Sequence, residues 1–118
     1  MPLALVGPGV IIGNHSMLLG QSFVGHDTTL DEMVFVANNA TVGGNIKIQR
    51  GVHVGSNSSI LEHIVVQEYA VIGLGAVVVK DVSAYNVVVG NPAKVIKILG
   101  RKINWQKIIM GDFLKNLM

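Results

Sequence analysis

A histidine followed directly by an aspartate, His26-Asp27, is the pair of residues in this sequence best suited to proton transfer. An imidazole accepts a proton near neutral pH, and an adjacent carboxylate can orient the ring and increase its basicity. Such a pair would act as a general base toward an amine or a hydroxyl group. The alternative interpretation is an ordinary surface histidine at a turn.

The other three histidines are His15, His53 and His63, and no two histidines of the chain are closely spaced. The absence of cysteine excludes disulfides and thiolate metal ligands. A zinc site needs three or four ligands at about 2 Å. We therefore expect no metal site, and we expect these three histidines at the surface.

The elements that must position these residues follow from a six-residue repeat. From residue 6 to residue 78 every sixth residue is aliphatic, and a small or aliphatic residue follows four positions later. Each of the thirteen hexads is too short for a helix, and Val, Ile and Thr are abundant, which predicts a short strand and a turn. A hexapeptide period is typical of a parallel β-helix. The aliphatic positions are Val6, Ile12, Leu18, Val24, Leu30, Val36, Val42, Ile48, Val54, Ile60, Val66, Ile72 and Val78.

Glycine follows the core aliphatic residue in several hexads. Because glycine tolerates backbone angles that other residues avoid, we expect these glycines to form the tight corners. They are Gly7, Gly13, Gly25, Gly43, Gly55 and Gly73.

The repeat resembles that of hexapeptide-repeat proteins, in which three strands form one coil of a left-handed parallel β-helix. The resemblance implies that residues eighteen apart stack at the strand spacing of about 4.8 Å. Thirteen hexads would make just over four coils. We therefore expect an all-β domain, a left-handed parallel β-helix, over residues 1–98.

Beyond the repeat the pattern changes. It ends at Val82, and residues 83–92 contain the turn signal Gly-Asn-Pro at 90–92, so we expect irregular structure there. Apolar residues within 101–117 fit a helical period. We expect residues 99–118 to form a helical tail that caps the prism or packs on a neighbouring subunit.

The composition excludes several classes of protein. A chain of 118 residues makes one domain, and no apolar run approaches the ~18 residues that span a bilayer. The N-terminus lacks a signal-peptide pattern, so we expect a cytoplasmic protein. Residues 80–118 hold seven of the nine lysines and arginines, which suits an anionic ligand or a solvated terminal helix. Aromatic residues are few and no nucleic-acid recognition motif occurs, so we expect no nucleic-acid partner.

Two stretches resemble a known family of enzymes. Residues 77–82 (VVVKDV) and 88–96 (VVGNPAKVI) resemble the terminal signature of left-handed β-helix acyltransferases. Residues 23–27 (FVGHD), followed eighteen residues later by 42–45 (VGGN), resemble the sugar O-acyltransferase branch. That branch includes sialic acid O-acetyltransferases and bacillosamine and perosamine N-acetyltransferases. The resemblance covers most of residues 1–98.

This resemblance implies acetyl-CoA as the acyl donor, His26 as the general base and Asp27 as the residue that assists it. Relatives in this branch usually carry an N-terminal α/β domain that binds the nucleotide-sugar. Here the first hexad begins at Val6. We therefore expect that domain to be missing, and the chain to be a stand-alone or excised acyltransferase half.

Acetyl transfer from a thioester needs a base, donors for the oxyanion and a groove for coenzyme A. We expect this groove to run parallel to the prism axis, between two subunits of a homotrimer. Gly44, in the same column as His26, would leave open space beside the histidine. Ser56 and Leu74 are eighteen residues apart and would present stacked backbone groups to the pantetheine arm.

Cations near the end of the repeat complete the expected cofactor site. Lys80, Lys94 and Lys97 could meet the phosphates of coenzyme A, although a solvated role suits each lysine singly. Phe35 stands near the place where the family often has a second histidine. It would contact the pantetheine arm by packing if it lines the groove, and it is otherwise a core or interface residue.

The sequence thus predicts an acetyl-CoA-dependent acetyltransferase that modifies an amino or hydroxyl group of a sugar or nucleotide-sugar. Without a cysteine nucleophile, direct attack by the acceptor is the simpler mechanism. One alternative is a trimeric β-helix scaffold without catalysis. The other is a γ-type carbonic anhydrase, which is less favoured because the closely spaced histidine pair of that family is absent here.

Overall fold

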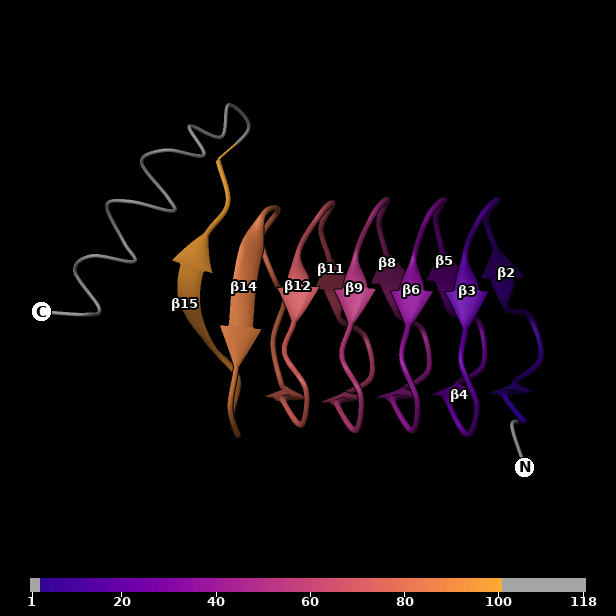
Figure 1. Cartoon of the computed structure of the whole chain (residues 1–118). Helices are drawn as coiled ribbons and strands as arrows, with labels where there is room; N and C mark the ends of the chain where they lie inside the picture. Colours follow the sequence, from indigo (N-terminus) through magenta and orange to yellow (C-terminus); the bar gives the residue numbers. More distant parts are fainter. Residues whose placement is uncertain (1–2, 101–118) are drawn as a thin grey trace, which may run out of the picture.

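The computed structural model describes residues 3–100, which form a left-handed parallel β-helix with three flat faces (Figure 1). Each hexad contributes one two-residue strand and one turn. Leu5 pairs with Phe23 and Val6 with Val24, so residues eighteen apart are stacked on one another. The predicted fold class and the three-strand coil are confirmed.

The three faces are sheets that we call A, B and C, in the order in which the chain first enters them, and all their strands are parallel except β15. Sheet A contains β1 (Leu5–Val6), β4 (Phe23–Val24), β7 (Thr41–Val42), β10 (Ser59–Ile60) and β13 (Val77–Val78). Sheet B contains β2 (Ile11–Ile12), β5 (Thr29–Leu30), β8 (Lys47–Ile48) and β11 (Val65–Val66). Sheet C contains β3 (Met17–Leu18), β6 (Phe35–Val36), β9 (His53–Val54), β12 (Val71–Ile72), β14 (Asn86–Val89) and β15 (Lys94–Ile98).

The core is a column of aliphatic side chains inside the prism. The predicted aliphatic positions from Val24 to Val78 are all buried, at 0–2% exposure. Val6 and Ile12 occupy the same hexad position but are 46% and 42% exposed, because the described residues contain no coil before theirs. Burial of apolar surface stabilises the stack at roughly 25 cal/mol per Å², so the inner coils contribute most.

The corners of the prism share one backbone conformation. The twelve residues at every sixth position from residue 9 to residue 75 have φ between 55° and 74°, and only three of them are glycine. This left-handed conformation costs about 1–2 kcal/mol for a residue with a Cβ atom, and asparagine and aspartate tolerate it better than most. The twelve are Gly9, His15, Gln21, Asp27, Met33, Asn39, Asn45, Gly51, Asn57, His63, Tyr69 and Gly75.

The glycines that follow the core residue are not at these left-handed positions, so that prediction was wrong. They lie instead where two coils approach closely. A Cβ atom on Gly25 would lie 2.7 Å from the carbonyl carbon of Gly43, and one on Gly55 would lie 2.6 Å from the carbonyl oxygen of Ile72. The absence of a side chain therefore permits close coil spacing at these positions.

Residues 83–92 are more regular than predicted, because β14 continues sheet C in parallel with β12. Val87 pairs with Val71, sixteen residues earlier rather than eighteen, and Val88 is buried. The apolar run from Val87 to Val89 thus keeps the core pattern across a turn two residues shorter. After the turn at 90–93, β15 pairs with β14 in antiparallel orientation.

The helical tail predicted for residues 99–118 lies outside the described residues, apart from residues 99 and 100. Within residues 3–100 no helix is long and apolar enough to cross a membrane.

Candidate active site

His26 and Asp27 lie in the turn between β4 and β5, at the corner where sheet A meets sheet B (the AB corner). The Asp27 amide donates to the carbonyl of Pro8 in the coil before, at 2.9 Å. The Asn45 amide in the coil after donates to the carbonyl of His26, also at 2.9 Å. The turn is therefore fixed by backbone hydrogen bonds on both sides.

The two side chains meet at this corner. Nδ1 of His26 lies 3.2 Å from Oδ2 of Asp27, and the side chains are 52% and 64% exposed. If Nδ1 donates to the ionised carboxylate, which can only accept hydrogen bonds, the neutral ring carries its lone pair on Nε2. An imidazole with a free Nε2 lone pair at the surface can take a proton from a bound amine or hydroxyl group.

Gly44 lies directly beside the imidazole. A Cβ atom on Gly44 would be 2.5 Å from Nε2 of His26 and 2.8 Å from Cδ2. The space that the missing side chain leaves at Gly44 is thus occupied by the His26 ring itself. On the other side, a Cβ atom on Gly9 would clash with Oδ1 of Asp27.

Ser56 and Leu74 lie at a different corner, between sheets C and A (the CA corner). They are stacked as predicted, since the Gly75 amide donates to the carbonyl of Ser56 at 2.8 Å. Neither the Ser56 amide nor the Leu74 amide donates a hydrogen bond to another described residue. The Leu74 side chain is 79% exposed, so this corner presents bare backbone donors beside an apolar side chain.

At the third corner, between sheets B and C (the BC corner), side chains accept hydrogen bonds from two of the backbone amides. The Glu32 amide donates to Oδ1 of Asp31 at 2.7 Å, and the Glu68 amide donates to Oε1 of Gln49 at 3.2 Å. The CA corner has alanine or glycine at the positions equivalent to Asp31 and Gln49 in its last three coils. Small residues there leave the donors of the CA corner open to a ligand.

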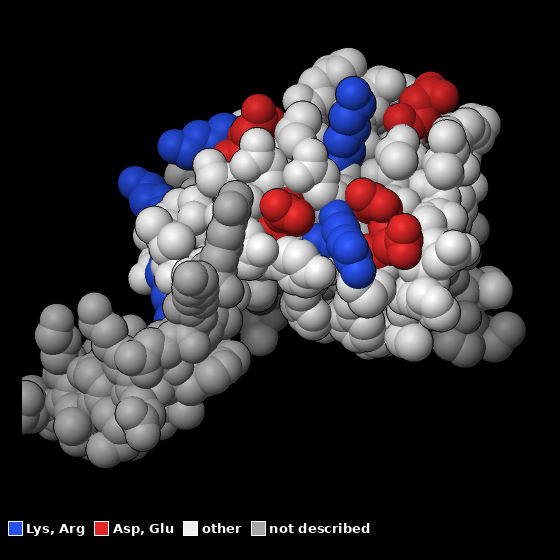
Figure 2. Space-filling model, turned by 90° about the horizontal axis from the view of Figure 1, so that it is seen from above, with Lys and Arg blue, Asp and Glu red and all other residues white. Residues whose placement is uncertain are grey.

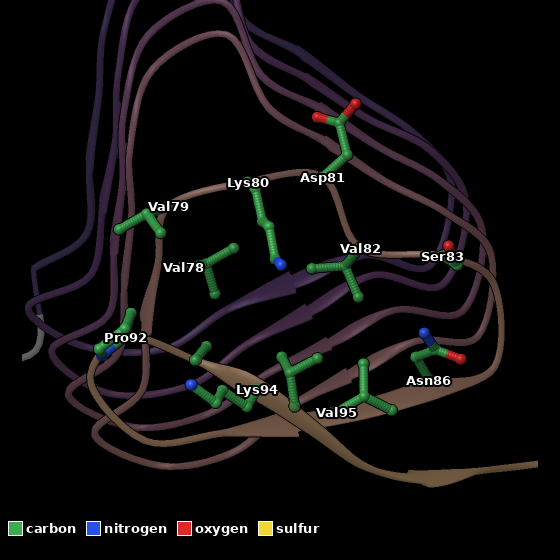
Figure 3. A pocket seen from close by; sticks show the side chains of 12 residues that line it. Val78, Val79, Lys80, Asp81, Val82, Ser83, Asn86, Pro92, Lys94 and Val95 are labelled. Atoms are coloured by element: carbon green, nitrogen blue, oxygen red, sulfur yellow. The ribbon is translucent and has the colours of Figure 1, made fainter.

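Lys80 and Lys94 line one hollow of about 680 Å³ at the C-terminal end of the prism (Figure 3). Its floor includes the apolar side chains of Val78, Val82 and Val88. In Figure 3 the ammonium group of Lys80 points over the hollow, while the carboxylate of Asp81 points away from it.

Lys80 lies in the last turn at the AB corner, which is shorter because Val78 stacks on Ile60 but Val82 stacks on Val66. Lys94 follows the turn at residues 90–93. Figure 2 shows several basic side chains toward this end, with acidic side chains interspersed over the face.

Phe35 does not lie with the other predicted site residues. Its side chain projects from sheet C and stacks on His53 of the next coil, with ring centroids 4.9 Å apart and planes 15° apart. Within one chain the predicted residues therefore occupy separate places: His26, Asp27 and Gly44 at the AB corner, Ser56 and Leu74 at the CA corner, and Phe35 on sheet C.

A second pair of an acid and a histidine was missed. Glu62 and His63 occupy the AB corner two coils after His26 and Asp27, with 4.0 Å between Oε2 and Nε2. Both side chains are more than 60% exposed. The sequence did contain a signal for this pair, because an acid and a histidine are adjacent at both places and the two places are thirty-six residues apart. Within residues 3–100 no group of three metal-ligating side chains occurs.

No family model matches the chain. The curated acyl-[acyl-carrier-protein]–UDP-N-acetylglucosamine O-acyltransferase of Pseudomonas paraeruginosa is 25% identical over 83 residues, covering 70% of this chain and 32% of that protein. The chain therefore spans about a third of the length of the curated relatives it matches.

Solved structures give a similar result. Serine acetyltransferase from Vibrio cholerae is 29% identical with a TM-score of 0.61, covering 80% of this chain and 38% of that one. Perosamine N-acetyltransferase from Caulobacter crescentus, in complex with CoA and GDP-perosamine, is 21% identical with a TM-score of 0.68, covering 80% of this chain and 53% of that one. At 21% identity the second likeness shows the fold alone. The chain is thus similar in sequence to hexapeptide-type acyltransferases and has the same β-helix fold.

Proposed function

We propose that this chain is an acetyl-CoA-dependent acetyltransferase that acts on an amino or hydroxyl group of a sugar or nucleotide-sugar. The observation that carries the proposal is the 3.2 Å contact between Nδ1 of His26 and Oδ2 of Asp27, with Nδ1 as the proposed donor and Nε2 as the proposed proton acceptor. The names of the similar proteins support acyl transfer in general. One of these names specifies an acyl carrier protein as the acyl donor. The choice of acetyl-CoA as the donor is therefore part of the proposal.

His26 carries the proton through the reaction. Acetyl-CoA supplies an acetyl group activated as a thioester. Nε2 of His26 removes the proton from the acceptor as the acceptor nitrogen or oxygen bonds to the acyl carbon. The carboxylate of Asp27 balances the imidazolium that results. As the carbon–sulfur bond breaks, the imidazolium returns the proton to the departing sulfur, so the products are the acetylated acceptor and CoA.

The chain's own groups fit a pantetheine arm at the CA corner. The open amides of Ser56 and Leu74 repeat at the coil spacing and can donate to the carbonyl groups of an extended chain. Lys80 and Lys94 at the C-terminal end provide positive charge for phosphates. Phe35 on sheet C would contribute by packing only.

We propose a homotrimer, because the groups assigned to the reaction are separated within one chain. The base lies at the AB corner, and the stacked amides assigned to the pantetheine arm lie at the CA corner. In a trimer the AB corner of one subunit could face the CA corner of its neighbour, so each active site would combine two chains. Exposed apolar side chains such as Phe23 and Leu61 are available for such contacts.

The first test is a CoA-release assay with acetyl-CoA and a panel of nucleotide amino sugars and free sugars. We expect His26→Ala to lower kcat by about 10²- to 10⁴-fold, the usual contribution of a general base. His63→Ala removes an exposed histidine from the same corner and should retain activity. Wild-type turnover in the His26→Ala variant would contradict the assignment of the base.

A second measurement separates catalysis from the scaffold alternative and tests the donor. Calorimetry should detect binding of acetyl-CoA to the wild-type protein. Absence of binding at millimolar acetyl-CoA, together with no transfer from an acyl carrier protein, would favour a non-catalytic scaffold. Transfer from acyl carrier protein alone would correct the donor and retain the reaction class.

A further inference from the structure

We propose that Gly9 and Gly44 are positioning residues that hold the Asp27 carboxylate and the His26 imidazole in contact. The effect of these glycines on catalysis rests on the function proposed above. Their contacts with His26 and Asp27 do not depend on it. The two glycines lie one coil before and one coil after the pair, each eighteen residues from the side chain it contacts.

The contact with Gly44 involves the whole exposed edge of the ring. Nε2, Cδ2 and Cε1 of His26 all lie within 3.0 Å of the position that a Cβ atom on Gly44 would occupy. Contacts shorter than about 3 Å between carbon atoms are strongly repulsive, since optimal separations are 3.5–4.0 Å. Any side chain at residue 44 would therefore displace the imidazole.

The contact with Gly9 restricts the carboxylate in the same way. The Cβ position at Gly9 coincides with the space of Oδ1 of Asp27, the oxygen that does not face the ring. Asp27 itself has a left-handed backbone, with φ of 55°, and its amide is bonded to Pro8. The preceding coil thus fixes the backbone of Asp27 and leaves the space that Oδ1 occupies.

The pair Glu62–His63 provides an internal comparison. It occupies the same corner and the same hexad positions, with acid and histidine in reverse order. The neighbours of His63 in its column are Asn45 and Asp81 rather than glycine. In that pair Nε2 of His63 and Oε2 of Glu62 are 4.0 Å apart, against 3.2 Å between His26 and Asp27, and the side chains of His63 and Glu62 are 72% and 65% exposed. The closer contact occurs where both side chains lie against glycine.

The functional result would be a fixed tautomer on an exposed residue. Surface side chains normally sample several rotamers, and the neutral imidazole carries its proton on either nitrogen. A ring lying against Gly44 with Nδ1 directed at Asp27 would carry its lone pair on Nε2, the atom proposed to act on the acceptor. Gly44 would thus act through His26, not by contact with a cofactor.

The test compares Gly44→Ala and Gly9→Ala with the wild-type protein labelled with ¹⁵N-histidine. Two-bond ¹H–¹⁵N spectra report which ring nitrogen carries the proton. In the wild type we expect His26 to be protonated on Nδ1. In Gly44→Ala we expect a mixture of tautomers, and a loss in kcat of about tenfold or more with KM for acetyl-CoA unchanged.

Two controls isolate the effect. The signals of His15 and His53 in the same samples should not change. Gly75→Ala introduces the same backbone strain as Gly9→Ala, because φ is 70° and 74° respectively, but a Cβ atom on Gly75 would contact nothing within 4 Å. It should therefore leave the His26 spectrum unchanged.

An unchanged His26 spectrum in both Gly44→Ala and Gly9→Ala would overturn the inference. Because the spectrum is recorded without substrate, this result is independent of turnover. If the wild-type protein proves inactive but Gly44→Ala still shifts the tautomer, the proposed function fails and the positioning stands.

Discussion

At the scale of single residues, the corner conformation explains how adjacent side chains cooperate. Neighbouring residues in a strand point to opposite faces, so they rarely meet. Asp27 has a left-handed backbone, and this turns its carboxylate toward the ring of His26. The sequence allowed the pairing to be predicted because the hexad placed both residues at a corner. The sequence could not predict that the His26 ring fills the space beside Gly44, because this depends on the rotamer of His26.

Replacement of Asp27 by asparagine tests the carboxylate separately from the base. Asparagine tolerates the left-handed conformation but carries no charge to balance the imidazolium. Asp27 is 64% exposed, so solvent screens part of its effect. We expect Asp27→Asn to lower kcat by roughly 10- to 100-fold, less than the loss from His26→Ala.

Glu62→Gln is the matched control for this change, because it neutralises the acid of the second pair at the same corner. It should retain the wild-type rate. Equal losses in the two variants would indicate a general effect of surface charge and contradict a specific role for Asp27.

At the scale of the structural element, the corner is the unit on which stability depends. Met33 has φ of 56° and is 39% exposed. Glycine should be preferred over alanine there, because it removes the cost of a left-handed Cβ. We expect Met33→Gly to be more stable than Met33→Ala by a few tenths to about 1 kcal/mol, measured by urea denaturation.

Lys47 in β8 provides the opposite case, since it has an extended backbone and an exposed side chain. There Lys47→Ala should be more stable than Lys47→Gly, because glycine weakens a strand. If alanine were equal to or better than glycine at residue 33 as well, corner strain would not govern stability.

The strands and the core were predictable because one aliphatic residue in six determines both. The last coil was not, because Val88 continues the core at a spacing of sixteen residues from Ile72. A strict six-residue pattern fails there, although Val87 to Val89 keep the apolar character of a buried strand. Similarly, glycine was assigned to the corners because of its freedom, whereas close coil contact is the reason for Gly25 and Gly55.

At the scale of the whole molecule, the proposed trimer predicts complementation between inactive variants. If each site takes its base from the AB corner of one chain and Lys94 from the CA corner of its neighbour, mixed trimers restore some complete sites. We expect His26→Ala mixed with Lys94→Glu, after unfolding and refolding together, to recover part of the wild-type kcat.

Each variant alone, refolded in the same way, should remain inactive, and light scattering should give three times the chain mass of 12.6 kDa. Absence of recovery in a mixture that forms mixed trimers would mean that each site lies within one chain.

The turn at the AB corner that contains Lys80 is two residues shorter than those before it, because Val78 stacks on Ile60 but Val82 stacks on Val66. Before that turn the corner is regular, and from His26 to Glu62 the column advances by two coils, which corresponds to about 10 Å at the spacing of strands. Equivalent groups along this edge are separated by a whole number of coil spacings, since no insertion occurs between these coils. A ligand lying along the edge would meet groups at these fixed intervals. Adding or deleting eighteen residues would change the reach between the two ends by one step while preserving the chemistry at each end.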